Sequence, residues 1–92
     1  MTSEYEPIDC DQHSVLEVLA LRRVQVRVEA LDELGNATRI TGRVIDVLTR
    51  DKAEFLRLET ADGLRDLRLD RLVTILDAAG RPQWRQKPGE HD

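Results

Sequence analysis

The chain has 92 residues, 40% of them hydrophobic and 35% charged, and its net charge at neutral pH is -4. This length allows one domain with a small core, and the composition is that of a globular chain rather than a disordered one. No apolar run approaches the roughly 18 residues that span a bilayer, and the N-terminus has no secretory signal pattern. With a single cysteine, Cys10, the sequence predicts a cytoplasmic protein without intramolecular disulfides.

The negative charge is concentrated at the N-terminus. Residues 1–21 contain five acidic residues and no Lys or Arg, whereas residues 22–92 carry 14 basic and 13 acidic residues. A block of one sign marks either an interaction surface or a solvated surface. The three aromatic residues are too few for a platform that stacks nucleic-acid bases, so the composition weighs against direct RNA binding.

A short amphipathic helix is predicted over about residues 11–21. Asp11 is a suitable N-cap, and four apolar residues at helical spacing form one stripe that should pack on the rest of the domain: Val15, Leu16, Val18 and Leu19. His13 and Glu17 lie on the opposite face. We therefore expect Glu17 to face water or a partner.

The rest of the domain is predicted to be β, with strands between about residues 24 and 76. Residues 24–30 alternate apolar and polar, the period of a half-buried strand. In the next strand the alternation slips at Val44, two residues after Gly42, which predicts a bulge or bend. Asp62 and Gly63 indicate a hairpin turn. Four or five antiparallel strands of this kind predict a mainly β (α+β) fold: an N-terminal helix packed on a small, strongly bent antiparallel open barrel, as in Sm-like and OB-type domains.

The domain is expected to cover residues 1–77, followed by a flexible C-terminal tail over 78–92. This last stretch has little periodicity and contains Gly and Pro. Trp84 lies within it, and the sequence leaves open whether its side chain is solvated or is an anchor on the domain or on a partner.

No catalytic residue, metal site or cofactor is predicted. Cys10 and His13 have the spacing of two metal ligands, but the other half of a zinc site is missing. There is no Gly-rich phosphate loop, and the carboxylates among the arginines are better explained by cross-strand ion pairs. Arg65, Arg68 and Arg71 could contact phosphates, although the acidic residues between them favour a mixed, solvated face.

Four segments resemble the Rho-binding antiterminator family known as Rof or YaeO. They are YEPIDCD at residues 5–11, LEV at 16–18, EFLRLE at 54–59 and RDLRLDRL at 65–72, and the similarity extends over about residues 5–76. The resemblance implies a helix on an Sm-like barrel that binds the N-terminal RNA-binding domain of the termination factor Rho. It further implies inhibition of termination because RNA loading is blocked.

The resemblance also implies which residues contact the partner. In the family the contacts come from the start of the helix and from the turn after the second strand, which here are Asp11, Ser14 and Glu17, and Arg50, Asp51 and Lys52. An acid is usual at the position of Ser14, and a basic residue at the position of Asp51. We expect Asp9 to compensate for the first departure, and Lys52 or Arg50 for the second.

Two other functions remain open from the sequence. An Sm-like barrel can bind RNA itself, which requires a basic, aromatic-lined surface that the composition disfavours. Alternatively, the chain could be an assembly module that pairs through exposed strand edges.

Overall fold

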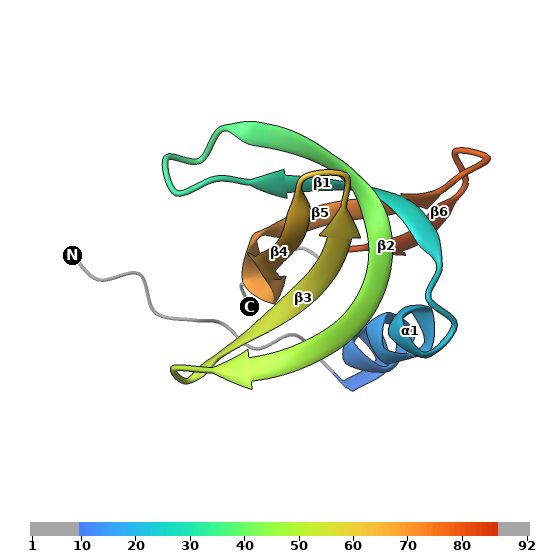
Figure 1. The fold of residues 1–92 in the computed structure, drawn as a ribbon. Helices are drawn as coiled ribbons and strands as arrows, with labels where there is room; N and C mark the ends of the chain where they lie inside the picture. Colours follow the sequence, from blue (N-terminus) through green and yellow to red (C-terminus); the bar gives the residue numbers. More distant parts are fainter. Residues whose placement is uncertain (1–9, 87–92) are drawn as a thin grey trace, which may run out of the picture.

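A computed structural model describes residues 10–86, which form one helix and six strands within that range (Figure 1). The elements are α1 (Cys10–Leu21), β1 (Gln25–Leu31), β2 (Ala37–Arg50), β3 (Ala53–Thr60), β4 (Gly63–Arg68), the 3-10 turn η1 (Leu69–Arg71), β5 (Leu72–Asp77) and β6 (Pro82–Arg85). The predicted fold class, mainly β with an α+β arrangement, is confirmed, with six strands in place of four or five.

The strands form one antiparallel sheet in the order β4-β3-β2-β1-β5-β6, with β4 and β6 as its edges. The sheet bends strongly because the long strand β2 curves, as Figure 1 shows. Its first half pairs with β1 and its second half with β3. One strand therefore connects the two halves of the open barrel.

Two residues of β2 explain how the strand bends. The pairing with β3 skips Ile45, between Val44 and Asp46, so the predicted slip is a β-bulge. At Gly42 a Cβ atom would lie 2.7 Å from the carbonyl oxygen of Glu59, which is closer than real Cβ contacts. Gly42 is therefore required by the close approach of β3 to β2, and the bulge itself lies three residues further on.

The core lies inside the bend of the sheet and is closed by α1. The alternation predicted for residues 24–30 is confirmed, because Val26, Val28 and Ala30 are buried while Gln25 and Arg27 are exposed. The remaining buried members of the core come from α1, β2, β3, η1, β5 and β6: Leu16, Leu19, Val44, Leu56, Leu58, Leu69, Leu72, Ile75 and Trp84.

The prediction of a flexible tail from residue 78 is wrong as far as residue 86. Pro82–Arg85 form β6 on the edge of β5, and the Trp84 side chain is only 5% exposed. Its Nε1 donates a hydrogen bond of 3.0 Å to the carbonyl oxygen of Gln12. The amide Nε2 of Gln12 in turn donates to the carbonyl oxygen of Arg85. Trp84 is thus an anchor on the domain itself, and β6 holds α1 in place.

The predicted apolar stripe of α1 is half correct. Leu16 and Leu19 are buried, whereas Val15 and Val18 are exposed. The buried face is rotated toward Gln12, a polar residue that the predicted apolar stripe does not include. Gln12 can be buried because β6 supplies its hydrogen-bond partners, and sequence periodicity does not register such a long-range pairing.

Candidate partner-binding surface

The outward face of α1 carries the three helix residues that the family resemblance singled out. Asp11, Ser14 and Glu17 are all exposed. They are three residues apart, so at about 100° per residue they occupy one sector of the helix, away from buried Leu16 and Leu19. The helix contains no Lys or Arg, and its outward face is therefore acidic. Asp9 lies outside the described residues.

Apolar side chains share this outward face with the acids. Val18 is 45% exposed and Leu21 83% exposed, and Val15 lies exposed at the border of the face. Hydrophobic side chains that are exposed singly are common on protein surfaces, but here three are exposed on one short helix. A mixture of apolar and charged groups of this kind is typical of protein interfaces.

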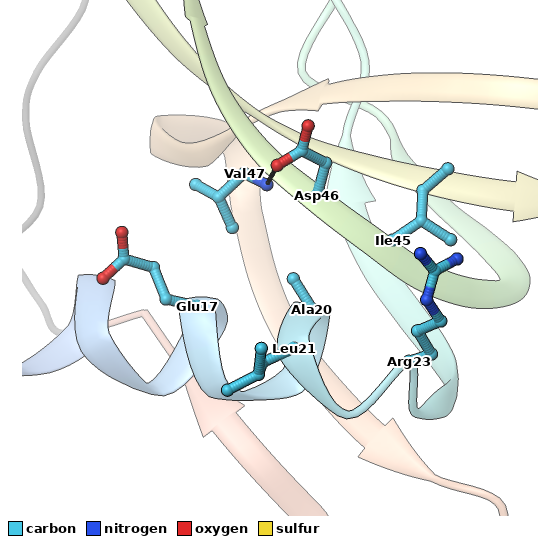
Figure 2. A pocket seen from close by; sticks show the side chains of 7 residues that line it. All are labelled: Glu17, Ala20, Leu21, Arg23, Ile45, Asp46 and Val47. Atoms are coloured by element: carbon cyan, nitrogen blue, oxygen red, sulfur yellow. Dashed lines mark hydrogen bonds between the residues drawn. The ribbon is translucent and has the colours of Figure 1, made fainter.

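A groove of about 340 Å³ separates the outward face from β2. Figure 2 shows Glu17, Ala20 and Leu21 on the helix side, and Ile45, Asp46 and Val47 on the strand side. The bulge at Ile45 places these three successive strand residues along the groove. The Asp46 carboxylate accepts a hydrogen bond of 2.8 Å from the backbone N–H of Val47, which fixes its orientation. The groove thus has an apolar lining and carboxylates from both elements.

Arg23 closes the other end of the groove and also ends the helix. The backbone N–H of Arg23 donates a hydrogen bond of 3.1 Å to the carbonyl oxygen of Ala20. The backbone N–H of Val24 donates one of the same length to the carbonyl oxygen of Leu19, and the two bonds together form a Schellman motif. Arg23 has a φ of 52°, a left-handed conformation for which Gly is usual. Its side chain extends toward β2 in Figure 2, so the cation that lines the groove among the described residues comes from the helix cap.

The second predicted contact region is the turn between β2 and β3. Asp51 and Lys52 both have positive φ, 53° and 65°, and both are exposed. A two-residue hairpin turn of this type normally uses Asn and Gly, since other residues adopt positive φ at a cost of about 1 kcal/mol or more each. The turn therefore holds two charged side chains outward in a conformation that the residues themselves disfavour.

Arg50, unlike Lys52, is paired within the fold. Its Nη1 lies 2.9 Å from Oδ2 of Asp66, and its guanidinium lies 4.5 Å from the centre of the Phe55 ring. Lys52 has no such partner among the described residues. Lys52 or Arg50 was expected to supply the basic group that is usual at the position of Asp51. Of these two residues, Lys52 is the one without an ionic partner in the described structure.

Asp66 is the centre of the ion pairs beside this turn. It accepts hydrogen bonds from Arg57 at 2.8 and 3.0 Å as well as from Arg50. The hydrogen bond from Arg57 is the main reason that the pKa of Asp66 lies below its ordinary value, while burial opposes this shift. The same pairing raises the pKa of Arg57. The network joins β2, β3 and β4 and supports the base of the turn.

His13 connects the two predicted contact regions. Its Nε2 lies 2.9 Å from Oε2 of Glu54 on β3, and its Nδ1 lies 3.6 Å from Oε2 of Glu17 on the helix. Glu54 follows Lys52 by two residues. The structure therefore links the helix to the strand that begins at the turn. The sequence placed His13 on the face away from the core but gave no signal for its pairing with Glu54, or for the position of Asp46.

Within residues 10–86 there is no group of three or more His, Cys, Asp or Glu side chains placed to hold a metal ion. The described part of the chain also contains no helix that is long and apolar enough to cross a membrane.

The fold and this surface define a small β protein whose N-terminal helix has an exposed acidic and apolar face. Residues 7–86 match the family described as "Modulator of Rho-dependent transcription termination (ROF)", and the chain belongs to this family. Rho is therefore the implied partner, and the modulation of Rho-dependent termination is the implied role. The family resemblance seen in the sequence is confirmed.

Two relatives and one solved structure agree with this assignment. Proteins named "Protein rof" from Escherichia coli (strain K12) and Shigella flexneri are each 28% identical to the chain over 75 residues, which is 82% of this chain and 84% of theirs. The solved structure "YaeO bound to Magnesium" from Vibrio cholerae O395 has a TM-score of 0.62 at 17% identity, covering 96% of this chain and 100% of that one. This similarity shows that the two chains share a fold.

Proposed function

We propose that the chain inhibits Rho-dependent termination without catalysis, by binding the N-terminal RNA-binding domain of Rho and blocking RNA loading. The contact surface is the outward face of α1, with Asp11, Ser14 and Glu17, together with the exposed turn residues Asp51 and Lys52. Asp9 belongs to the same acidic segment and is proposed to add to it. Arg50 supports the turn through Asp66 and Phe55 instead of contacting Rho.

The observation that carries the proposal is the combination of exposed acids and exposed apolar side chains on one face of α1. A surface that holds RNA must present positive charge to the phosphates. An acidic face is complementary to such a surface and is attracted to it from a distance. Val18 and Leu21 add apolar area whose removal from water favours a complex.

Occupation of the RNA site is sufficient for inhibition in this account. The acidic helix and the RNA backbone compete for the same cations, so they exclude each other. Because the attraction is electrostatic, the affinity for Rho should fall as salt rises, with the Debye length shortening from about 10 Å at 0.1 M to about 3 Å at 1 M. The overall charge of -4 and the few aromatic residues favour this mechanism over direct RNA binding by the chain.

The charge reversal Glu17→Lys tests the proposed contact surface. Glu17 is 61% exposed, so folding should be unaffected within about 0.5 kcal/mol. A charged contact that becomes desolvated in a complex costs about 2 to 5 kcal/mol when it is lost, which corresponds to at least roughly a thirty-fold loss of affinity for Rho. Titration against Rho at two salt concentrations measures this loss, and circular dichroism checks the fold.

Glu33→Lys is the matched control for this experiment. Glu33 is also an exposed glutamate, but it lies in the turn between β1 and β2, outside the proposed contact surface. Its reversal changes the net charge by the same amount and should leave most of the affinity for Rho. Equal losses for the two variants would mean that only the overall charge matters, and an unchanged affinity for a folded Glu17→Lys variant would exclude the helix as the contact.

A further inference from the structure

A second cavity lies in a part of the molecule that the Rho contact does not use. It has a volume of about 570 Å³ and lies between the β1–β2 hairpin on one side and β3, β4 and η1 on the other. No residue of α1 lines it. Four arginines do, and for them we name it the arginine cleft: Arg39, Arg65, Arg68 and Arg71.

Two of these arginines are unpaired within the part of the chain that the structure describes. Among residues 10–86, Arg65 and Arg71 form no hydrogen bond or ion pair with another side chain, although Arg71 is half-buried. Arg39 lies 3.6 Å from Glu29, and Arg68 lies 2.6 Å from Asp70, both of which are acids outside the lining. As far as the described residues show, the cleft therefore presents two unpaired guanidinium groups beside two others that are paired with acids.

The carboxylates of the cleft offset these charges only in part. Asp66 is already paired with Arg57 and Arg50, on the side of β3 and the turn. Asp32 accepts the backbone N–H groups of Leu34 and Asn36 and so shapes the hairpin turn. Glu33 is the remaining acid of the lining, exposed in the same turn. Its negative charge weakens the binding of any anion in the cleft.

The walls of the cleft also carry apolar side chains. Ile40, Leu67 and Phe55 line the cleft beside the arginines. Small-molecule sites typically combine a mainly apolar lining with a few polar groups in about 300–1,000 Å³. Guanidinium groups match phosphate oxygens in a planar, bidentate geometry, and they keep their charge at every pH of interest. The cleft thus offers charge for phosphates and apolar area for a ring.

We propose that the arginine cleft binds a compact polyphosphate of the nucleoside triphosphate class. The polyphosphate carries several negative charges within a few bonds, and these can meet Arg65 and Arg71 together, while the base lies against the apolar wall. A single-stranded RNA spreads one charge over each nucleotide and gains less from a short cluster of arginines. This inference goes beyond the binding of Rho and does not depend on it.

Binding of adenosine triphosphate and of inorganic pyrophosphate, measured by calorimetry with the full chain and without Rho, tests the proposal. Both should bind, and ATP should bind more tightly because of its base. The double variant Arg65→Gln/Arg71→Gln should bind ATP at least roughly tenfold more weakly, since charged hydrogen bonds are lost. Glu33→Gln should bind ATP more tightly than the wild type does, an effect that loss of structure would not produce.

The matched control is Arg43→Gln/Arg85→Gln, which removes two exposed arginines outside the cleft and gives the same net charge as the test variant. Its affinity for ATP should stay close to that of the wild type, and thermal unfolding of all variants checks their fold. Three results would overturn the proposal: no binding of ATP at millimolar concentration, equal affinities for the two double variants, or tighter binding of a short single-stranded RNA than of ATP.

Discussion

Replacement of Trp84 by Ala should remove a large part of the stability of the fold. The side chain is only 5% exposed, packs in the core and donates its Nε1 hydrogen bond to Gln12. Truncation of a buried Trp to Ala typically costs about 3 to 5 kcal/mol. A chain of 92 residues has a free energy of unfolding of about 5 to 14 kcal/mol, so the variant should lose roughly a fifth or more of it.

The measurement is urea unfolding followed by far-UV circular dichroism, which does not depend on Trp fluorescence. Trp84→Phe separates the two contributions of the side chain. It keeps a ring in the core but leaves the Gln12 carbonyl without its donor, which should cost about 1 to 3 kcal/mol. A loss below about 1 kcal/mol for Trp84→Ala would refute the reasoning, because β6 would then be peripheral and would not hold α1.

Three further predictions follow from single residues. Gly42→Ala should destabilise the fold measurably in urea, because its Cβ would lie 2.7 Å from the Glu59 carbonyl oxygen; unchanged stability would mean that β2 and β3 can separate freely. Lys52→Gly should raise the unfolding midpoint, since Gly adopts the φ of 65° without strain, and should weaken binding to Rho; a gain in both stability and affinity would remove Lys52 from the contact surface. Asp66→Asn should flatten the acid dependence of stability. The folded-state pKa of Asp66 lies below its ordinary value of 3.8, so its stabilisation is complete above about pH 4 and is lost as the pH falls through the folded pKa; unfolding curves with the same pH dependence in both proteins would contradict this.

The local patterns of the sequence predicted the strands well. The alternation over residues 24–30 corresponds to a strand with one buried face, and the slip at Val44 corresponds to a bulge. Both are properties of neighbouring residues, and the buried face of a sheet imposes them directly. The mainly β fold with an N-terminal helix could therefore be predicted from the sequence.

Features that depend on distant partners could not be predicted. Gln12 and Trp84 are 72 positions apart, and the hydrogen bonds between α1 and β6 satisfy the buried polar side chain of Gln12 and tie β6 to the helix. The same contact rotates α1, so Val18 faces outward rather than into the core. The role of Arg50 also depends on Asp66, a residue two strands away in the sheet. The errors on the tail and on the apolar stripe of α1 came from long-range hydrogen bonds that leave no periodic signal.

The family resemblance predicted the two contact regions but not how they are arranged. Glu17 and Lys52 belong to separate segments of the chain, and the pairing of His13 with Glu54 is what joins the helix to β3. Sequence spacing also gave no indication of the groove beside Glu17, because the bulge of β2 forms its second wall. The contribution of these residues to Rho binding is a prediction.

Competition between the chain and RNA for Rho is the most direct test of the central claim. A fluorescent single-stranded RNA is bound to the RNA-binding domain of Rho in the intact hexamer, and the chain is added while the anisotropy of the RNA and the amount of bound chain are recorded. Our account predicts that the RNA is released as the chain binds, and that Glu17→Lys needs a much higher concentration to release it. A ternary complex, in which the chain saturates Rho while the RNA stays bound, would contradict the account.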